Sequence, residues 1–294
     1  MTRVALALSS CVVFFAAGER VEAQTFGAAQ AAHPASGFFV GGGLGYSFTS
    51  YGTQSVYNKG ISEISGPNIP PSSGTADGPP VSSSFGGKSR VIPDAQFGYF
   101  QQFAGSEWLW GAKLSYNYIG ATSGVQNLVI PQFGTSSDPN NATFTGYSVT
   151  QSYSISISHQ LASLFFVGRS FGQGFWYLGA GPSLSQIKVS LNGVVGYATI
   201  NNQLTNISGA PQSFASTDWQ FGAAATAGVT YFLTPSLFFD AKYLFSAPKF
   251  RTLHVTSPFY NPGTNVTYSG TLIGTATVNV RNTQAVSIAL NKMF

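Results

Sequence analysis

The sequence is poor in charge, has a single cysteine and, beyond its first two dozen residues, has no long apolar run. Charged side chains make up 7% of its 294 residues, against about 25% in an ordinary soluble domain. This composition indicates that little of the surface is made for bulk water. A helix that spans a membrane needs about 20 consecutive apolar residues, and no stretch after residue 23 approaches that length. A helical membrane protein is therefore not expected.

Aromatic residues and glycine are abundant instead. The chain holds 25 Phe, 14 Tyr and 34 Gly. Aromatic side chains favour strands, and glycine marks the turns between them. The composition predicts an all-β protein with many strands.

The N-terminal residues have the pattern of a secretory signal. Arg3 precedes a mostly apolar stretch at 4–17, and Val21-Glu22-Ala23 offers a small-residue cleavage site. We predict a signal peptide at 1–23. A lipoprotein box at Leu8-Ser9-Ser10-Cys11 is the alternative, but it leaves too short an apolar core. With cleavage after Ala23 the only cysteine is lost, so the mature chain forms no disulfide.

The segment 108–118 has the clearest strand pattern. One face carries Trp108, Trp110, Ala112, Leu114, Tyr116 and Tyr118, and the other carries Gly111, Lys113, Ser115 and Asn117. In a membrane barrel, lipid-facing apolar residues alternate with lumen-facing small or polar residues, and aromatic girdles mark both interfaces. A strand of a soluble sandwich also alternates, but it has no reason to place aromatics at both ends of its apolar face. The pattern therefore favours a transmembrane strand.

Seven further segments alternate in the same way, at 38–48, 91–101, 147–161, 175–184, 219–231, 237–245 and 278–294. In the fourth strand, 147–161, we expect Tyr153, Ile155 and Ile157 to face lipid and the intervening serines to face the lumen. The links between strands alternate in length: short links lie at 102–107, 162–174 and 232–236, and long ones at 49–90, 120–146, 189–217 and 247–277. The link 162–174 is the least secure, because 161–167 is apolar enough to extend the fourth strand. We predict an eight-stranded antiparallel up-and-down transmembrane β-barrel with short periplasmic turns and four long, exposed extracellular loops. This outer-membrane barrel is expected at 37–294, after a periplasmic segment at 24–36.

Three stretches, 37–46, 177–184 and 286–294, resemble the small outer-membrane barrels of the OmpA-type and opacity-like superfamily, particularly alphaproteobacterial relatives. The resemblance implies that the last strand is the signal read by the barrel-assembly machinery, carried by Val286, Ile288, Leu290 and Phe294. Lys292 stands where an apolar residue is expected, and near an interface its amine could reach water. The resemblance also implies a location in the outer membrane of a Gram-negative bacterium.

Five charged residues fall on predicted lumen-facing positions: Asp94, Lys113, Asp240, Lys242 and Arg281. An eight-stranded barrel is just wide enough for its side chains to fill it, and buried charges need partners. We expect a polar network that plugs the lumen. A narrow or gated path for a solute is the alternative.

Cations also gather near the predicted extracellular rim, at Lys88, Arg90, Lys188, Lys249, Arg251 and again Arg281. Arg and Lys form strong charge-assisted hydrogen bonds with phosphate. These residues are candidates for contacts with lipopolysaccharide, and ordinary solvated loop charges are the simpler interpretation.

The residues give little support for catalysis, metal binding or nucleic-acid binding. Of the three histidines, His33 precedes the barrel, His159 is expected on the outward face near the periplasmic end of the fourth strand, and His254, in the fourth long loop, has Asp218 as its one imaginable partner. No His, Cys, Asp or Glu spacing suggests a metal or cofactor site, and the basic residues form no run suited to nucleic acid. We expect a non-enzymatic surface barrel that contacts outer-membrane lipids and host or surface ligands. A small porin is the alternative, and a soluble secreted β-protein is a third possibility.

Overall fold

The computed structural model describes residues 33–137, 142–200, 202–249, 251–262, 265 and 267–294. The predicted signal peptide 1–23 and residues 24–32 of the predicted periplasmic segment lie outside the described residues. In the part that is described, no helix is long and apolar enough to cross a membrane.

Eight strands close into an antiparallel barrel. They are β1 (Ser36–Tyr51), β5 (Lys88–Gln102), β6 (Trp108–Ser136), β7 (Ala142–Phe171), β8 (Gly174–Ile200), β10 (Gln212–Thr234), β11 (Leu237–Pro248) and β14 (Val280–Met293). The ring runs β1–β5–β6–β7–β8–β10–β11–β14 and returns to β1. The predicted eight-stranded antiparallel barrel is confirmed.

Links of two or five residues join the barrel strands at one end, at 103–107, 172–173 and 235–236. The predicted link 162–174 is wrong, since β7 continues to Phe171, which pairs with Gly174 across a tight turn. The apolar run at 161–167 extends the strand, because it supplies alternating side chains for the lumen and for the outer surface of the barrel.

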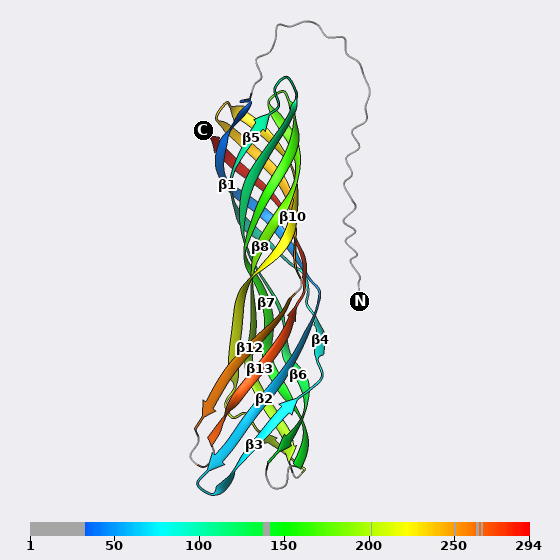
Figure 1. The fold of residues 1–294 in the computed structure, drawn as a ribbon, viewed down its shortest axis with the longest axis vertical. Helices are drawn as coiled ribbons and strands as arrows, with labels where there is room; N and C mark the ends of the chain where they lie inside the picture. Colours follow the sequence, from blue (N-terminus) through cyan, green and yellow to red (C-terminus); the bar gives the residue numbers. More distant parts are fainter. Residues whose placement is uncertain (1–32, 138–141, 201, 250, 263–264, 266) are drawn as a thin grey trace. The chain divides into compact units, whose positions relative to one another are not determined.

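The long connections at the other end contain strands of their own. These are β2 (Thr53–Gly66), β3 (Ile69–Asp77), β4 (Val81–Ser84), β9 (Gln203–Asn206), β12 (Arg251–Asn261) and β13 (Thr267–Val278). The order β12–β13–β2–β3–β6 joins them to the barrel sheet, while β4 pairs with β2 and β9 with β8 (Figure 1). We call these six strands, with the continuations of β6, β7, β8 and β10 beyond the barrel, the extension. The regions expected to be loops are therefore largely sheet.

The outer surface of the barrel is apolar. Large exposed side chains include Phe38 and Leu44 on β1, Leu178 on β8, Phe221 on β10 and Ile288 on β14. All of these residues lie in the segments 38–48, 175–184, 219–231 and 278–294, which were predicted to alternate between lipid-facing and lumen-facing residues. The alternation of each strand places their neighbours inward. We call this surface the apolar belt.

The faces of β7 reverse where the strand passes from the barrel into the extension. Its pairing with β8 shifts register between Ile157 and Gln160, and β6 shifts between Tyr118 and Ala121. Because side chains alternate with a period of two, an irregularity of this kind turns the following set over. Tyr153, Ile155 and Ile157 are therefore fully buried inside the extension, and the prediction that they face lipid is wrong.

The extension has its own apolar core. It comprises Tyr51, Val56, Phe85, Ile92, Ile119, Ala121, Ile130, Tyr153, Ile155, Ile157, Ile187, Val189, Leu191, Val194, Phe214, Leu253, Ala276, Val278, Val280 and Ala285. Burial raises the pKa of the phenols of Tyr51 and Tyr153, and the Tyr51 hydroxyl donates a hydrogen bond of 2.9 Å to the Ala121 carbonyl. Burial on this scale stabilises the strands beyond the barrel as a packed sheet.

Candidate functional site

Two buried ion pairs occupy the middle of the lumen. Asp94 lies on β5, Lys113 on β6, and Asp240 and Lys242 alternate inward along β11. The Lys113 amine lies 3.2 Å from the Asp240 carboxylate, and the Lys242 amine lies 2.9 Å from that of Asp94. All four side chains are at most 3% exposed. Two cations and two anions make the network neutral, as burial in a low dielectric requires.

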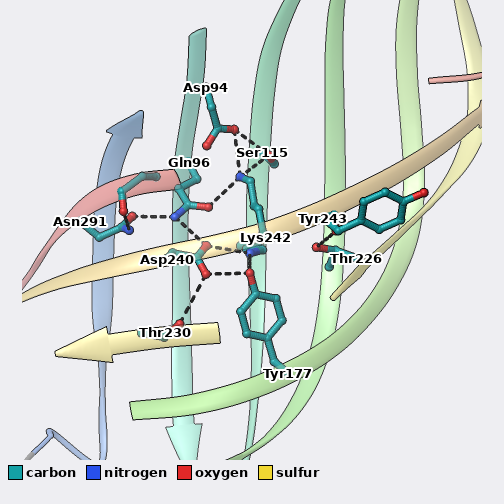
Figure 2. A network of polar contacts seen from close by, with 12 residues as sticks. Asp94, Gln96, Ser115, Tyr177, Thr226, Thr230, Asp240, Lys242, Tyr243 and Asn291 are labelled. Carbon is teal, nitrogen blue, oxygen red and sulfur yellow. Dashed lines mark hydrogen bonds and ion pairs between the residues drawn. The ribbon is translucent and has the colours of Figure 1, made fainter. Parts of the chain in front are cut away.

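Neutral side chains satisfy the remaining hydrogen bonds of the Asp240 pair (Figure 2). The Tyr177 hydroxyl accepts a hydrogen bond of 2.6 Å from Lys113 and donates one of 2.8 Å to Asp240. Thr230 also donates to the Asp240 carboxylate, at 3.5 Å. The Lys113 amine lies 4.2 Å from the centre of the Tyr177 ring, so the ring adds a cation–π contact.

Gln96 joins the two pairs. Its amide nitrogen donates to Asp240 at 2.9 Å and to the Asn291 side chain at 2.8 Å, and its oxygen accepts from Lys242 at 2.9 Å. Lys242 donates a further bond of 2.9 Å to Ser115. Such a connected network fixes the positions of side chains from β5, β6, β11 and β14 at once.

Glycine leaves the space that these large side chains need. Gly228 lies across from Lys242 in the pairing of β10 with β11. A Cβ at that position would overlap the Tyr177 hydroxyl. The glycine is therefore part of the packing around the network.

Apolar side chains close the lumen on both sides of the network. Toward the short links, a cluster of Phe39, Phe100, Leu109, Phe166, Phe175, Tyr177, Phe232, Phe238 and Met293 fills the interior. His33 stacks on Phe232 with a centroid distance of 5.4 Å. Toward the extension, Ile92 and Ile119 of the extension core follow on from Asp94 and Asn117 along β5 and β6. The interior is thus filled at three successive levels.

One row of buried polar side chains has no hydrogen-bond partner among the described residues. Asn117, Gln160, Ser185 and Gln220 face one another in register across β6, β7, β8 and β10. Each is at most 3% exposed, and unpartnered polar atoms occur in all four. Burial of an unpartnered polar group is destabilising, so this row is expected to lower the stability of the barrel.

The structure brings four of the five predicted lumen residues together and places Arg281 elsewhere. The expectation for Arg281 is corrected, because its side chain is exposed. The pairing of β1 with β14 shifts register between Ser50 and Tyr51, and Val280 and Thr283 take the inward positions. Gln96, Ser115 and Tyr177 were not among the residues predicted for the network, although their inward positions beside charged residues were a usable signal.

The cations predicted at the rim are exposed: Lys88, Arg90, Lys188, Lys249, Arg251 and Arg281. We call these six residues the cationic band. Arg90 donates to the Gly120 carbonyl at 2.5 Å, and Arg251 forms an ion pair with Asp218. Beside that pair, Trp219, Phe221, Lys249 and Arg251 line a pocket of about 250 Å³.

The histidines and the last strand are arranged as follows. His254 contacts the Thr275 hydroxyl at 3.1 Å, so it does not form the imagined pair with Asp218. His159 contacts Tyr116 and Tyr118 on the outer face, at the end of the barrel that adjoins the extension rather than the short links, because β7 is longer than predicted.

Val286, Ile288, Leu290 and Phe294 are all exposed on the belt. Within the described residues, no cluster of three or more His, Cys, Asp or Glu could hold a metal.

Comparison with known proteins gives no match to any family model and none to a curated protein. Several solved structures are similar to this chain, among them OprG, Ail and Neisserial surface protein A. OprG from Pseudomonas aeruginosa shares 13% identity over 90% of this chain and 98% of its own, with a TM-score of 0.34. Ail of Yersinia pestis shares 12% over 79% and 97%, with a TM-score of 0.23. Neisserial surface protein A shares 12% over 77% and 96%, also with a TM-score of 0.23.

Proposed function

We propose that this protein is a non-enzymatic outer-membrane β-barrel whose closed barrel anchors the extension at the cell surface, where the extension contacts other molecules. The observation that carries the proposal is the contrast between the two parts. The lumen is filled by a neutral network between apolar clusters, while the strands continue past the apolar belt into a sheet with its own core.

The apolar belt supports the membrane part of this proposal. Exposed side chains of this size over a whole barrel surface suit lipid and would be unfavourable in water. The length of the strands supports the surface part. β7 has 30 residues, which span about 100 Å along the strand at roughly 3.3 Å per residue. An apolar belt is about 25 Å tall, so much of β7 extends beyond it even when the strand is tilted.

The outer face of the extension offers a surface for contact. A depression of about 750 Å³ is lined by Lys59, Thr75, Asp77, Phe133, Gly134, Thr135, Thr143, Phe144, Thr145, Thr199 and Asn202. Phe133 is 56% exposed there. Exposed aromatic side chains among polar neighbours are typical of surfaces that bind partners. This depression is therefore the surface of the extension on which we expect other molecules to bind.

The alternative function, a small porin, is disfavoured by the same interior. A solute would have to displace the aromatic cluster at the short-link end and separate two buried ion pairs. Breaking a buried pair costs several kcal/mol. The barrel is therefore expected to block solutes.

Two measurements test the proposal. The purified protein in planar bilayers is expected to show no reproducible conductance steps, and steps that disappear in Lys113→Met would establish the channel instead. In intact cells, a cysteine introduced in place of exposed Tyr260 on β12 is expected to react with a membrane-impermeant maleimide, since the mature chain has no other cysteine if the signal is cleaved. A cysteine replacing Ser106 in the first short link is the matched control and should react after the cells are opened. Labelling of both or of neither in intact cells would refute the surface role.

A further inference from the structure

The charges on the outer surface of the barrel differ sharply between its two ends. At the end with the short links, Glu107 pairs with Arg169 at 2.7 Å, and Lys292 hydrogen-bonds to Ser236. At the other end lies the cationic band, and Asp218 is the one acidic residue that the described part of the chain places among its six cations. One rim is therefore close to neutral and the other is strongly positive.

The cationic band follows directly on the apolar belt. Arg90 and Lys88 pair with the buried residues Ser47 and Thr49 near the end of β1. They therefore lie beside the last exposed side chains of the belt on that strand but not in its outward row. Lys188 pairs with Thr217, two residues from exposed Trp219. A molecule bound by Lys188 would therefore touch the edge of the belt as well.

The pocket beside Asp218 combines both kinds of surface. Phe221 is 70% exposed and Trp219 is 45% exposed, and both belong to the last outward positions of the belt on β10. The backbone amide of Lys249 donates to the Phe221 carbonyl at 2.8 Å, which fixes the start of the lysine beside the rings. Lys249 has no acidic side chain within ion-pair distance in the described part of the chain, so its charge is available.

We propose that this pocket binds the phosphorylated headgroup of an outer-leaflet glycolipid of the lipopolysaccharide type. Lys249 and Arg251 bind the phosphate, and Trp219 and Phe221 contact the adjoining sugar and the upper part of the acyl chains. The ligand is expected to be an anion, because Arg and Lys form their strongest hydrogen bonds with phosphate and carboxylate. The apolar belt adjoins the pocket, so a lipid is a better ligand than free phosphate. Trp side chains are favoured at such a boundary between an apolar surface and water.

This inference rests on the proposed membrane position of the barrel and deepens it. The full mature chain in detergent is titrated with micelles that contain lipopolysaccharide, with the same lipopolysaccharide after removal of its phosphates, and with inorganic phosphate alone. The variants are Lys249→Gln, Lys249→Gln/Arg251→Gln, and the control Arg169→Gln/Lys292→Gln at the opposite rim. The single variant retains the Arg251–Asp218 ion pair, so it tests the pocket even where the double variant folds poorly. Heat-modifiable migration on a denaturing gel checks the fold of each variant.

The Lys249→Gln variant should bind lipopolysaccharide about tenfold more weakly, as expected for one lost charged hydrogen bond, and the double variant more weakly still. The control variant should bind like the unaltered protein. Dephosphorylated lipopolysaccharide should bind the unaltered protein as weakly as intact lipopolysaccharide binds the double variant. Equal binding by the Lys249→Gln variant and the unaltered protein, equal loss in the control, or full displacement by inorganic phosphate would overturn the assignment. The conductance and labelling measurements that test the proposed function do not measure binding of lipopolysaccharide. A negative result in the binding titration therefore leaves the proposed function standing.

Discussion

Replacement of Lys113 by Met is the most direct test of a closed and dry lumen. The substitution keeps a long side chain but leaves Asp240 without its lysine partner at 3.2 Å, in a site where both side chains are at most 3% exposed. Removing one partner of a buried ion pair costs about 3–5 kcal/mol, because the other charge stays buried and uncompensated. The hydrogen bonds that Asp240 accepts from Gln96 and Tyr177 place the expected loss toward about 3 kcal/mol.

The assay is urea unfolding of the barrel in lipid vesicles, followed by tryptophan fluorescence. The matched control is Arg169→Met, which breaks the ion pair with Glu107 at 2.7 Å where the side chains are 52% and 63% exposed. Exposed pairs contribute about 0–1 kcal/mol, so the control should shift the free energy of unfolding very little. If Lys113→Met also costs less than about 1 kcal/mol, the pair is screened by water, and the argument for a closed lumen fails.

Three further predictions concern other parts of the chain. Ile155→Ala should lower the free energy of unfolding by about 2–5 kcal/mol, since Ile155 is fully buried in the extension core. A loss well below this range in urea unfolding would show that Ile155 is not buried. Gln160→Leu should leave stability unchanged or raise it by about 1–3 kcal/mol, because both polar atoms of its amide are buried without a partner; a clear loss in the same assay would mean that the amide is satisfied. Phe294→Ser should reduce the amount of barrel assembled in cells far more than it lowers the free energy of unfolding of protein refolded from urea, since Phe294 is 77% exposed and lies outside the core; equal losses in both measurements would contradict a role as an assembly signal.

The barrel was predictable from the sequence because lipid and lumen impose opposite demands on alternate residues. Along 108–118 the alternation is unbroken, and Trp108, Leu114 and Tyr116 are exposed while Lys113 and Ser115 are buried. The charges of the lumen network followed from the same parity, because Asp94, Asp240 and Lys242 sit in the middle of regular strands. Their pairing distances could not be read from the sequence, since they depend on which strands meet across the lumen.

The extension was not predictable in the same way, because alternation says which residues share a face but not which side that face is on. Tyr153, Ile155 and Ile157 have the pattern of a lipid-facing strand, yet they are buried in a protein core. The register shifts near Gly120 and Ile157 that reverse the faces have no strong local signal, although Gly120 adopts a positive φ of 58°. Arg281 was misplaced for the same reason, by the shift at Ser50 and Tyr51.

The hydrogen-bonded ladder that runs from β6 through β7 to β8 holds the backbone of the extension by main-chain contacts and by inward side chains. Outward side chains such as Thr122, Gln126 and Phe133 contribute nothing to that core. Substitutions at outward positions are therefore expected to change the chemistry of this surface one residue at a time, while the backbone of the sheet stays the same. The inward face of each strand maintains the fold, and the outward face of the same strand is free to vary.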